Sequence, residues 1–390
     1  MALLTLRRPG PGVVPVAPNY PGSIAPAQMQ ALPYGQFVGP DGQVHDQFDL
    51  ASTEVSMEGQ NLTWAAGAKP APVPVIHANY LADYELHVQL SGTIDQVASE
   101  SQAPAVAANG LGALFEEVRL VYSGQDNPVQ VAGRWLPVRQ QVEVHAFADT
   151  AKVSLPAQNT TTAAVTGNWS IDAILRVPVA LSLRSKPGDW SPRGLVMVQD
   201  DAVSVYLYLI CGQLTDFLSV DSSDTINLTS GTIQVRQNAL TIPEDPYSAP
   251  DLSELHTMQT ITHNLLAGTR TQVPILTGDV YTRFGFAVVL ASGQVDATNS
   301  AGLKGVTIQY SGGYRKDDTL SPEEIRYRQA TRDGVAVPAG FYVFDWADRW
   351  PRQVVNAADI TDFRLVLNFS AAPASGTLVE TFQENLVPAA

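Results

Sequence analysis

Few residues of this chain have the types and the spacing that chemistry requires. Its histidines include no pair with the spacing of a helical metal-binding motif. Two of them, His256 and His263, are seven residues apart and would share one face only on a helix, and no carboxylate pattern completes a site there. We therefore expect a polar or interface face at these two positions, and we expect the chain to hold no metal and no cofactor.

Adjacent carboxylates occur at Glu116–Glu117 and at Asp200–Asp201, and paired carboxylates are what a glycosidase uses. Neighbouring residues on a strand point to opposite faces, so solvated strand ends or turns are favoured instead. The chain has no GxSxG elbow, no phosphate-binding GxxxxGK[ST] loop and no GxGxxG fingerprint. The sequence thus predicts a protein that is not an enzyme.

The tryptophans leave one alternative open, which is an all-β carbohydrate-binding or glycan-processing protein. Exposed tryptophans clustered in a groove would favour it, whereas aromatic residues spread along subunit edges would favour an assembly protein. Two of the six lie in the stretch "FDWADRW", where anchors of a subunit interface are at least as plausible. The six are Trp64, Trp135, Trp169, Trp190, Trp346 and Trp350.

Cys211 is the only cysteine, so the chain can form neither an internal disulfide nor a thiolate metal site. It lies in the apolar stretch "VSVYLYLICG", where we expect an inert buried thiol.

The charge balance bears on the partners of the protein. The 390 residues carry a net charge of −15, and only 16% of them are charged, against about 25% in average domains. No cluster of Lys and Arg is present to neutralise phosphates, so we expect no direct binding to nucleic acid. Surfaces with few charges are common where subunits pack against one another.

The first 45 residues are expected to form an extended N-terminal arm. Eight of the 27 prolines fall within residues 1–40, and Arg7 and Arg8 are the only charged side chains there. Such a segment can form neither a helix nor a central strand, and it buries too little to fold by itself. A neighbouring surface must hold it, and Arg7 and Arg8 are candidates for contact with anionic lipid headgroups.

The rest of the chain has the period-two pattern of β-strands. In "YELHVQL", Leu86, Val88 and Leu90 share one face. In "VSVYLYLIC" both faces are apolar, which predicts a strand covered on both sides. Frequent Gly and Pro turns separate such segments, so the pattern predicts an all-β sandwich or barrel. The Pro-rich stretch "TIPEDPYSAPD" at 241–251 is the predicted boundary between two units, 46–245 and 246–390, each long enough for an eight-stranded jelly roll.

One helix is well specified, in the stretch "SPEEIRYRQATRD". Ser321 can cap it, Pro322 occupies the first helical position, and Glu324 completes a capping box. We expect a surface helix from Pro322 to about Thr331, with a thin apolar stripe of Ile325, Tyr327 and Ala330. The simplest interpretation of its charges is that they form local Glu–Arg ion pairs on a solvated helix. We favour contacts with acidic groups of an adjacent subunit, and the candidates are Arg326, Arg328 and Arg332, together with the anchors Trp346 and Trp350.

Three stretches resemble one family in order and spacing. They are "LFEEVRLVYSGQDNPVQVAGRW" (114–135), "LRVPVALS" followed by "GLVMVQDDAVSVYLYL", and "YRKDDTLSPEEIRYRQATRDGVAVPAGFYVFD" (314–345). Together they resemble the major capsid proteins of tectivirus-like phages, which are tailless icosahedral phages with an internal membrane. The Pro-rich N-terminus departs from that family, which more often has a polar, helix-prone segment there.

The resemblance implies a double jelly roll, that is, two eight-stranded β-barrels or sandwiches, with short helices in loops. It implies a homotrimer of pseudo-hexagonal outline that tiles an icosahedral shell over an internal membrane. The expected partners are neighbouring capsomers and other capsid proteins, such as penton or minor membrane proteins. The expected location is the virion, with assembly in the host cytoplasm.

Overall fold

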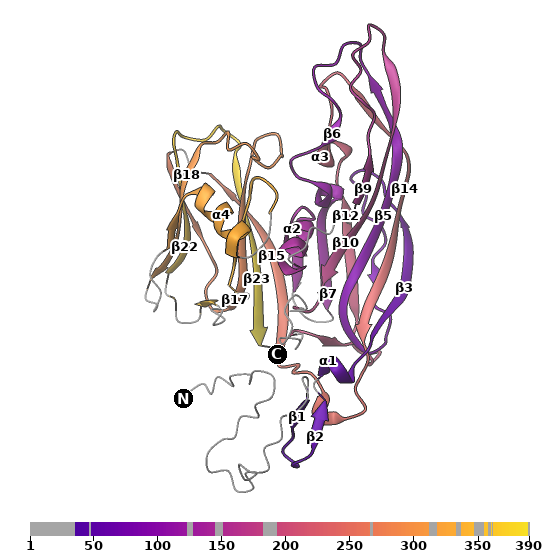
Figure 1. Cartoon of the computed structure of the whole chain (residues 1–390), viewed down its shortest axis with the longest axis vertical. Coiled ribbons are helices and arrows are strands. Elements are labelled where there is room, and N and C mark those ends of the chain that lie inside the picture. The colour runs from indigo at the N-terminus through magenta and orange to yellow at the C-terminus, as the bar shows by residue number, and fades with distance from the viewer. Residues whose placement is uncertain are drawn as a thin grey trace.

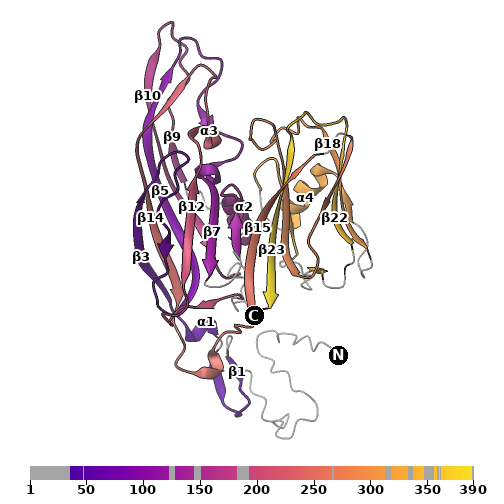
Figure 2. The ribbon, with the colours of Figure 1, turned by 180° about the vertical axis from the view of Figure 1, so that it is seen from behind.

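The computed structural model describes residues 36–46, 48–122, 128–144, 151–181, 193–265, 268–311, 318–332, 337–346, 355–357, 360 and 362–388. Residues 1–35, most of the expected arm, lie outside the described residues. The described chain begins with a hairpin of β1 (Gln36–Val38) and β2 (Val44–Asp46) at the foot of the molecule (Figure 1). Two upright β-sandwiches stand above it side by side, and the one formed by residues 54–240 is the taller (Figures 1 and 2).

The first sandwich has two sheets whose inner faces meet in a large apolar core. The expected alternation holds, because Leu86, Val88 and Leu90 are all buried in that core. One sheet has the order β3 (Glu54–Thr63), β14 (Thr225–Leu240), β5 (Tyr80–Gln96), β10 (Val165–Pro178) and β9 (Ala151–Ser154), with β11 (Val196–Met197) also paired to β5. The facing strands are β4 (Val73–Pro74), β12 (Val205–Cys211), β7 (Phe115–Tyr122) and β8 (Val129–Val131).

The second sandwich encloses a core of its own, rich in aromatic side chains. Its first sheet has the order β15 (Glu254–Asn264), β23 (Leu378–Pro388), β17 (Val280–Val289) and β20 (Phe341–Asp345), and β21 (Val355–Asn356) also pairs with β17. The facing sheet has the order β16 (Arg270–Pro274), β22 (Asp362–Phe369), β18 (Leu303–Ser311) and β19 (Asp318–Leu320).

The two sandwiches have the same topology. If the eight main strands of each are counted along the chain, one sheet has the order first, eighth, third, sixth and the other has the order second, seventh, fourth, fifth. This is the strand order of a jelly roll. The predicted fold class, an all-β double jelly roll with short helices in its loops, is therefore confirmed.

The two jelly rolls share a sheet. Strand β8 of the first roll pairs in parallel with β15 of the second, where Val129 lies opposite Met258. The result is a nine-stranded sheet that runs through both rolls. The two rolls use opposite faces of it: Val129 and Met258 belong to the core of the first roll, whereas Phe284 and Val379, on the other face of β17 and β23, belong to the core of the second. Its second half is thus covered on both faces.

The expected surface helix is α4 (Pro322–Arg332). The capping box is present, because the Ser321 amide donates to Glu324 Oε2 and the Glu324 amide donates to Ser321 Oγ. Ile325 is buried as expected. The rest of the expected apolar stripe is wrong: Tyr327 is 69% exposed and Ala330 is exposed, and Gln329 is buried instead, donating to the carbonyl of Val343.

The remaining short elements lie in loops. The helix α2 (Trp135–Val144) follows β8 and was not expected from the sequence. The others are α1 (Phe48–Ala51), α3 (Leu214–Phe217), the 3-10 turns η2 (Leu111–Leu114) and η3 (Pro246–Ser248), and the paired strands β6 (Ala105–Val106) and β13 (Leu218–Ser219). Among the described residues, no helix is both long and apolar enough to cross a bilayer.

Candidate functional site

The most unusual chemistry of the described chain lies where α2 meets the second roll. Trp135 stacks on Phe382, with ring centroids 5.2 Å apart, and meets the edge of Phe341. A Cβ atom at Gly285 would lie 2.8 Å from the Trp135 ring, so only glycine lets the helix approach β17 this closely. The helix therefore covers the face of the shared sheet that points away from the core of the second roll, and Figure 1 shows it between the two rolls.

Below the Trp135 ring the contact becomes ionic. Arg139, the fifth residue of α2, donates from Nε to Glu384 Oε1 at 2.9 Å, and Arg283 Nη1 donates to Glu384 Oε2 at 2.7 Å. All three residues are at most 3% exposed. Arg139 also pairs with Glu143 on its own helix, and Arg283 with Asp345 on the neighbouring strand β20. Water is excluded from all of these contacts.

The charge of Glu384 depends on these partners. Burial alone would raise the pKa of this carboxyl, but the attraction of Arg139 and Arg283 and the hydrogen bond with His256 outweigh burial and hold the pKa well below its usual range. His256 lies with Nε2 2.7 Å from Glu384 Oε1 and Nδ1 3.1 Å from the Val179 carbonyl. Both of its neighbours are acceptors, so the doubly protonated ring satisfies both contacts, whereas a neutral ring satisfies one.

The ionic chain continues into the first roll. Glu143 at the far end of α2 is 3.9 Å from Arg176 on β10, and Arg176 pairs with the fully buried Asp83 on β5. The second oxygen of Asp83 accepts from Asn238 Nδ2 at 2.7 Å. One connected set of charges thus links β5 and β10 to β17, β20 and β23 through a single helix. We call it the junction network: Asp83, Arg139, Glu143, Arg176, His256, Arg283, Asp345 and Glu384.

The junction network is structural in character. Its carboxylates lie beside guanidinium or amide donors. No group of three or more His, Cys, Asp or Glu side chains in the described part of the chain could hold a metal ion. What the network can do is fix one docking position of the two rolls, because any shift would leave buried charges unpaired.

The histidine pair considered in the sequence does not form a site. His256 and His263 both lie on β15, where an odd separation places them on opposite faces. His256 belongs to the junction network, and His263 contacts the Thr381 hydroxyl at 3.3 Å. Cys211 is buried as expected, and burial raises the pKa of its thiol to about 11. Asp200 and Asp201 lie exposed in a turn, in agreement with the plain interpretation.

Of the predicted interface residues, Arg326, Arg328 and Trp346 have side chains that the structure describes. Arg326 is exposed and Arg328 partly exposed on α4, whereas the side chain of Arg332, the whole of Trp350 and the arm residues Arg7 and Arg8 lie outside what the structure describes. The expectation for Trp346 is wrong. It is fully buried in the core of the second roll, where it stacks with Phe284 and Phe344.

The first sequence interpretation of β12 also needs correction. One face is buried as expected, but Tyr206 and Tyr208 on the other face are each 39% exposed. Among the residues that the structure describes, this half of the shared sheet is therefore covered on one side only. Its outer face also carries the Arg119–Glu117 ion pair of β7, directly beside Tyr208 in the register.

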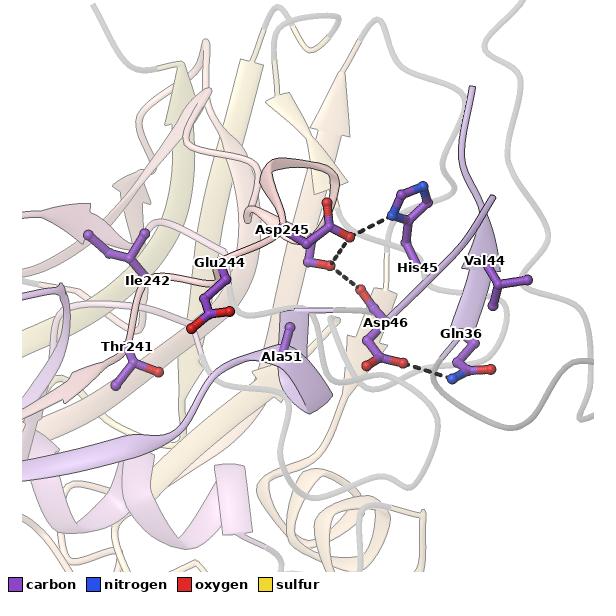
Figure 3. A pocket seen from close by; sticks show the side chains of 10 residues that line it. Gln36, Val44, His45, Asp46, Ala51, Thr241, Ile242, Glu244 and Asp245 are labelled. Atoms are coloured by element: carbon purple, nitrogen blue, oxygen red, sulfur yellow. Dashed lines mark hydrogen bonds and ion pairs between the residues drawn. The ribbon is translucent and has the colours of Figure 1, made fainter. Parts of the chain in front are cut away.

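The hairpin at the foot forms one wall of a pocket of about 620 Å³ (Figure 3). Its other wall is the segment between the two rolls, from Thr241 to Ser248. His45 bridges the two walls, with Nδ1 2.5 Å from Asp245 Oδ2 and Nε2 2.9 Å from Asp41 Oδ1, and the Ser248 hydroxyl donates to the Asp46 carbonyl. These contacts attach the hairpin to the segment that joins the rolls.

Sequence reasoning missed α2 and the junction network. The signals available were weak: Pro137 falls in the first turn of the helix, where its missing N–H costs nothing, and Gly133 precedes that turn. The charges of the network gave no signal, because Arg139 and Glu384 are 245 residues apart in the sequence.

Comparison with known proteins agrees with this architecture. The crystal structure of the major capsid protein (MCP) of STIV is similar with a TM-score of 0.57 at 15% identity, covering 86% of this chain and 97% of that chain. A chain in the atomic structure of Sulfolobus Turreted Icosahedral Virus gives the same TM-score and identity, with 86% and 91% covered. The PBCV-1 virus capsid model gives a TM-score of 0.53 at 13% identity, with 86% and 93% covered.

No protein-family model matches the sequence, and no curated protein matches it either. At these identities the likeness is one of fold: this chain has the double jelly-roll architecture of viral major capsid proteins.

Replacing Arg139 with Met tests the junction network. The change keeps the apolar stem but leaves Glu384 and Glu143 buried with fewer partners, so we expect unfolding to become easier by about 3 kcal/mol, measured by urea denaturation. The matched control is Arg119→Met, which removes the partly exposed pair with Glu117 and should cost at most about 1 kcal/mol. Equal effects of the two substitutions would show that the network does not hold the rolls together.

The attachment of the hairpin should depend on pH. Hydrogen bonds to Asp41 and Asp245 raise the pKa of His45, and the same contacts lower the pKa of both carboxyls. The His45 contribution is therefore complete below the unfolded pKa, about 6.5, and is lost as the pH rises through the raised value. The contribution of the two carboxylates is lost only as the pH falls through their lowered values.

We expect hydrogen-exchange protection of β2, corrected for intrinsic rates, to be greatest in mild acid and to fall as the solution becomes alkaline. In His45→Gln this fall should disappear. A wild-type profile that stays flat from mild acid to mild alkali would contradict the role of His45.

Proposed function

We propose that this protein is a structural major capsid protein whose homotrimers tile an icosahedral virion shell. The observation that carries the proposal is the fold: two upright jelly rolls joined through one sheet, with 97% of the STIV major capsid protein covered by the match. Two jelly rolls fixed to each other suit a capsid subunit, which must keep one shape while its edges bind neighbouring subunits.

The charge and surface properties support a building block and not a catalyst. The members of the junction network are engaged with one another and are buried, apart from Arg176, whose side chain is 18% exposed. The net charge of −15 disfavours direct contact with nucleic acid. We therefore propose a protein without enzymatic activity that acts through contacts with copies of itself.

Helix α4 is the proposed contact between subunits. It lies on the outside of the second roll, it buries Pro322, Ile325 and Gln329, and it exposes Arg326 and Tyr327. Arginines on an acidic protein favour acidic groups of a neighbour, and an exposed tyrosine beside them is a typical interface residue. Arg328 and Arg332 on the same helix extend the proposed contact.

The N-terminal arm is proposed to bind a neighbouring subunit or the inner surface of the shell. Its last residues, 36–45, form most of the hairpin β1–β2 at the foot of the molecule, below the upright rolls. Arg7 and Arg8 are the proposed contacts with an internal membrane. Penton and minor membrane proteins are further proposed partners, in a virion assembled in the host cytoplasm.

The alternative of a glycan-binding protein is not favoured by any contact seen. Four of the six tryptophans are described, and all four are at most 2% exposed, so they form no platform for a sugar: Trp64, Trp135, Trp169 and Trp346.

The mass of the purified protein in solution tests the proposal. We expect a trimer by light scattering at micromolar concentration and shell-like assemblies by electron microscopy at native concentration. A chain without residues 2–30 should still form the trimer but yield fewer shells, because the Pro-rich composition of this segment cannot support a fold of its own. A monomer in the absence of denaturant would contradict the proposed function.

Reversing two charges on α4 tests its role as an interface. Arg326→Glu with Arg328→Glu should weaken trimer or shell assembly, most strongly at low salt, where repulsion is least screened, with little change in thermal stability. The matched control is Lys69→Glu with Lys304→Glu, which changes the net charge equally at exposed positions elsewhere. Normal assembly of the α4 variant at low ionic strength would exclude α4 from the interface.

A further inference from the structure

Three loops close the upper end of the first roll, opposite the foot. They follow β5, precede β10 and precede β14, and the register sets the ends of these strands side by side, with Gln96 opposite Val165 and Asp95 opposite Thr225. The first loop contains β6 and the third contains β13, and these two strands pair. Figure 1 shows that the first roll rises above the second at this end. We call it the tip and define it as residues 95–106, 155–165 and 218–228.

The tip carries negative charges only. It contains no Lys, Arg or His, and its four carboxylates are Asp95, Glu100, Asp221 and Asp224. Two of these have neutral donors. Asp95 accepts from Thr166 Oγ1 at 2.7 Å and from Asn227 Nδ2 at 2.9 Å. Asp221 accepts from the amide and the hydroxyl of Ser101, at 3.0 and 2.5 Å. These hydrogen bonds connect the loops, but the tip has no basic side chain to neutralise its carboxylates.

Glu100 and Asp224 are in contact inside the tip. Glu100 Oε2 accepts from the Asn159 amide at 2.5 Å and from Gln96 Nε2 at 3.0 Å. Asp224 Oδ1 accepts from the Val97 amide at 2.9 Å. The second oxygen of each group, Glu100 Oε1 and Asp224 Oδ2, is buried and has no hydrogen-bond donor among the described residues. Burial raises the pKa of Glu100, and the contact with the Asp224 carboxyl raises it further.

The two oxygens without donors need a positive charge between them. Glu100 is 6% exposed, and a buried oxygen without a partner is costly. Two like charges in contact also repel each other. A proton or a metal cation can supply the missing charge. The amide donors on Glu100 Oε2 and Asp224 Oδ1 favour the ionised form of both groups, and an acidic tip attracts cations. These observations favour a metal cation.

We propose that the tip binds one divalent cation of the calcium type, held by Glu100 Oε1 and Asp224 Oδ2. Both ligands are carboxylate oxygens, which Ca²⁺ prefers, and together they balance its charge. Asp224 is partly exposed, so solvent has access to the ion and supplies the ligands that the protein does not. With solvent as a partner, two carboxylates suffice, fewer than the groups of three or more side chains considered above. The proposal departs from the sequence expectation of a chain without metal.

A bound cation would fasten the loops of the tip to one another. Glu100 lies in the first loop and Asp224 in the third. Asn159 of the second loop donates its backbone amide to Glu100 and its side-chain amide to the Val97 carbonyl, at 2.7 Å. The ion therefore acts on all three loops. Every contact comes from a single chain, so the inference does not depend on the proposed trimer.

Calcium titration of the full chain tests the site. After removal of bound ions with EDTA, isothermal titration calorimetry should show one Ca²⁺ per chain, with a Kd of about 10⁻⁴ to 10⁻³ M, as in weak sites. Hydrogen exchange gives a second readout. The amides of Val97 and Asn159, which donate to the two carboxylates, should exchange more slowly with Ca²⁺ than in EDTA. Amides of β20 in the second roll should not change.

Glu100→Gln and Asp224→Asn each remove one charge of the pair with little change of shape. Each should weaken Ca²⁺ binding by about tenfold or more. The matched control is Asp95→Asn, which removes the same charge from the tip at an exposed carboxylate outside the pair. Its Kd should stay within about twofold of the wild-type value, because exposed charges are screened.

Thermal unfolding checks that the variant folds and gives an independent signature. In EDTA, the Tm of Glu100→Gln should equal or exceed that of the wild type, because the repulsion from Asp224 is gone. In saturating Ca²⁺ the order should reverse, because only the wild type binds the ion tightly.

The results separate a cation from the alternatives. An equal Tm of the wild type in Ca²⁺ and in EDTA, with no heat of binding, would overturn the inference. If the wild type is then more stable in mild acid and Glu100→Gln is not, a shared proton joins the two carboxyls instead. A loss of affinity in Asp95→Asn as large as in Glu100→Gln would show diffuse attraction of ions to an acidic surface, and it would overturn the site as well.

Discussion

The buried ion pair between Arg139 and Glu384 is the contact on which the arrangement of the two rolls depends. Moving a charge out of water costs several kcal/mol, and that cost is offset only when donors and acceptors are matched in good geometry. Here Glu384 receives Arg139 from the first roll and Arg283 from its own sheet. The rolls can therefore dock in one position, and any slip along the shared sheet would separate Arg139 from Glu384 and leave the buried Arg139 without that partner.

The shared sheet explains why such a network lies in the middle of the molecule. A sheet covered on both faces normally has apolar residues on both, and β17 is buried along almost its whole length. The face toward the second roll follows that rule with Phe284 and Phe286. The face toward α2 carries Arg283 beside a glycine. Its contact with α2 is therefore specific and does not depend on apolar packing alone. Apolar packing supplies the affinity between the rolls, and the charges decide which register they adopt.

The same design leaves the outer surfaces incomplete. Among the described residues, Tyr206 and Tyr208 on β12 and the exposed side of α4 have no cover. The assembly proposed for this protein would place copies of the chain against these surfaces.

What the sequence determined by itself was local. The alternation of Leu86 and Val88, the capping box of Ser321 and Glu324, and the turn signals depend only on neighbouring residues, so the all-β class, the strands and α4 could be predicted from them. The resemblance added the double jelly roll. The sequence could not reveal that Trp346 is a core residue, because an aromatic residue beside arginines is equally typical of an interface.

Only the tertiary structure decided the rest, and the reason is distance along the chain. Arg139 and Glu384 are 245 residues apart, and each looks like an ordinary charged side chain in its own segment. Whether Tyr206 is covered depends on which face of the shared sheet each roll occupies. That choice is set by the pairing of Val129 with Met258. Both are apolar residues, and no local sequence pattern indicates that they pair.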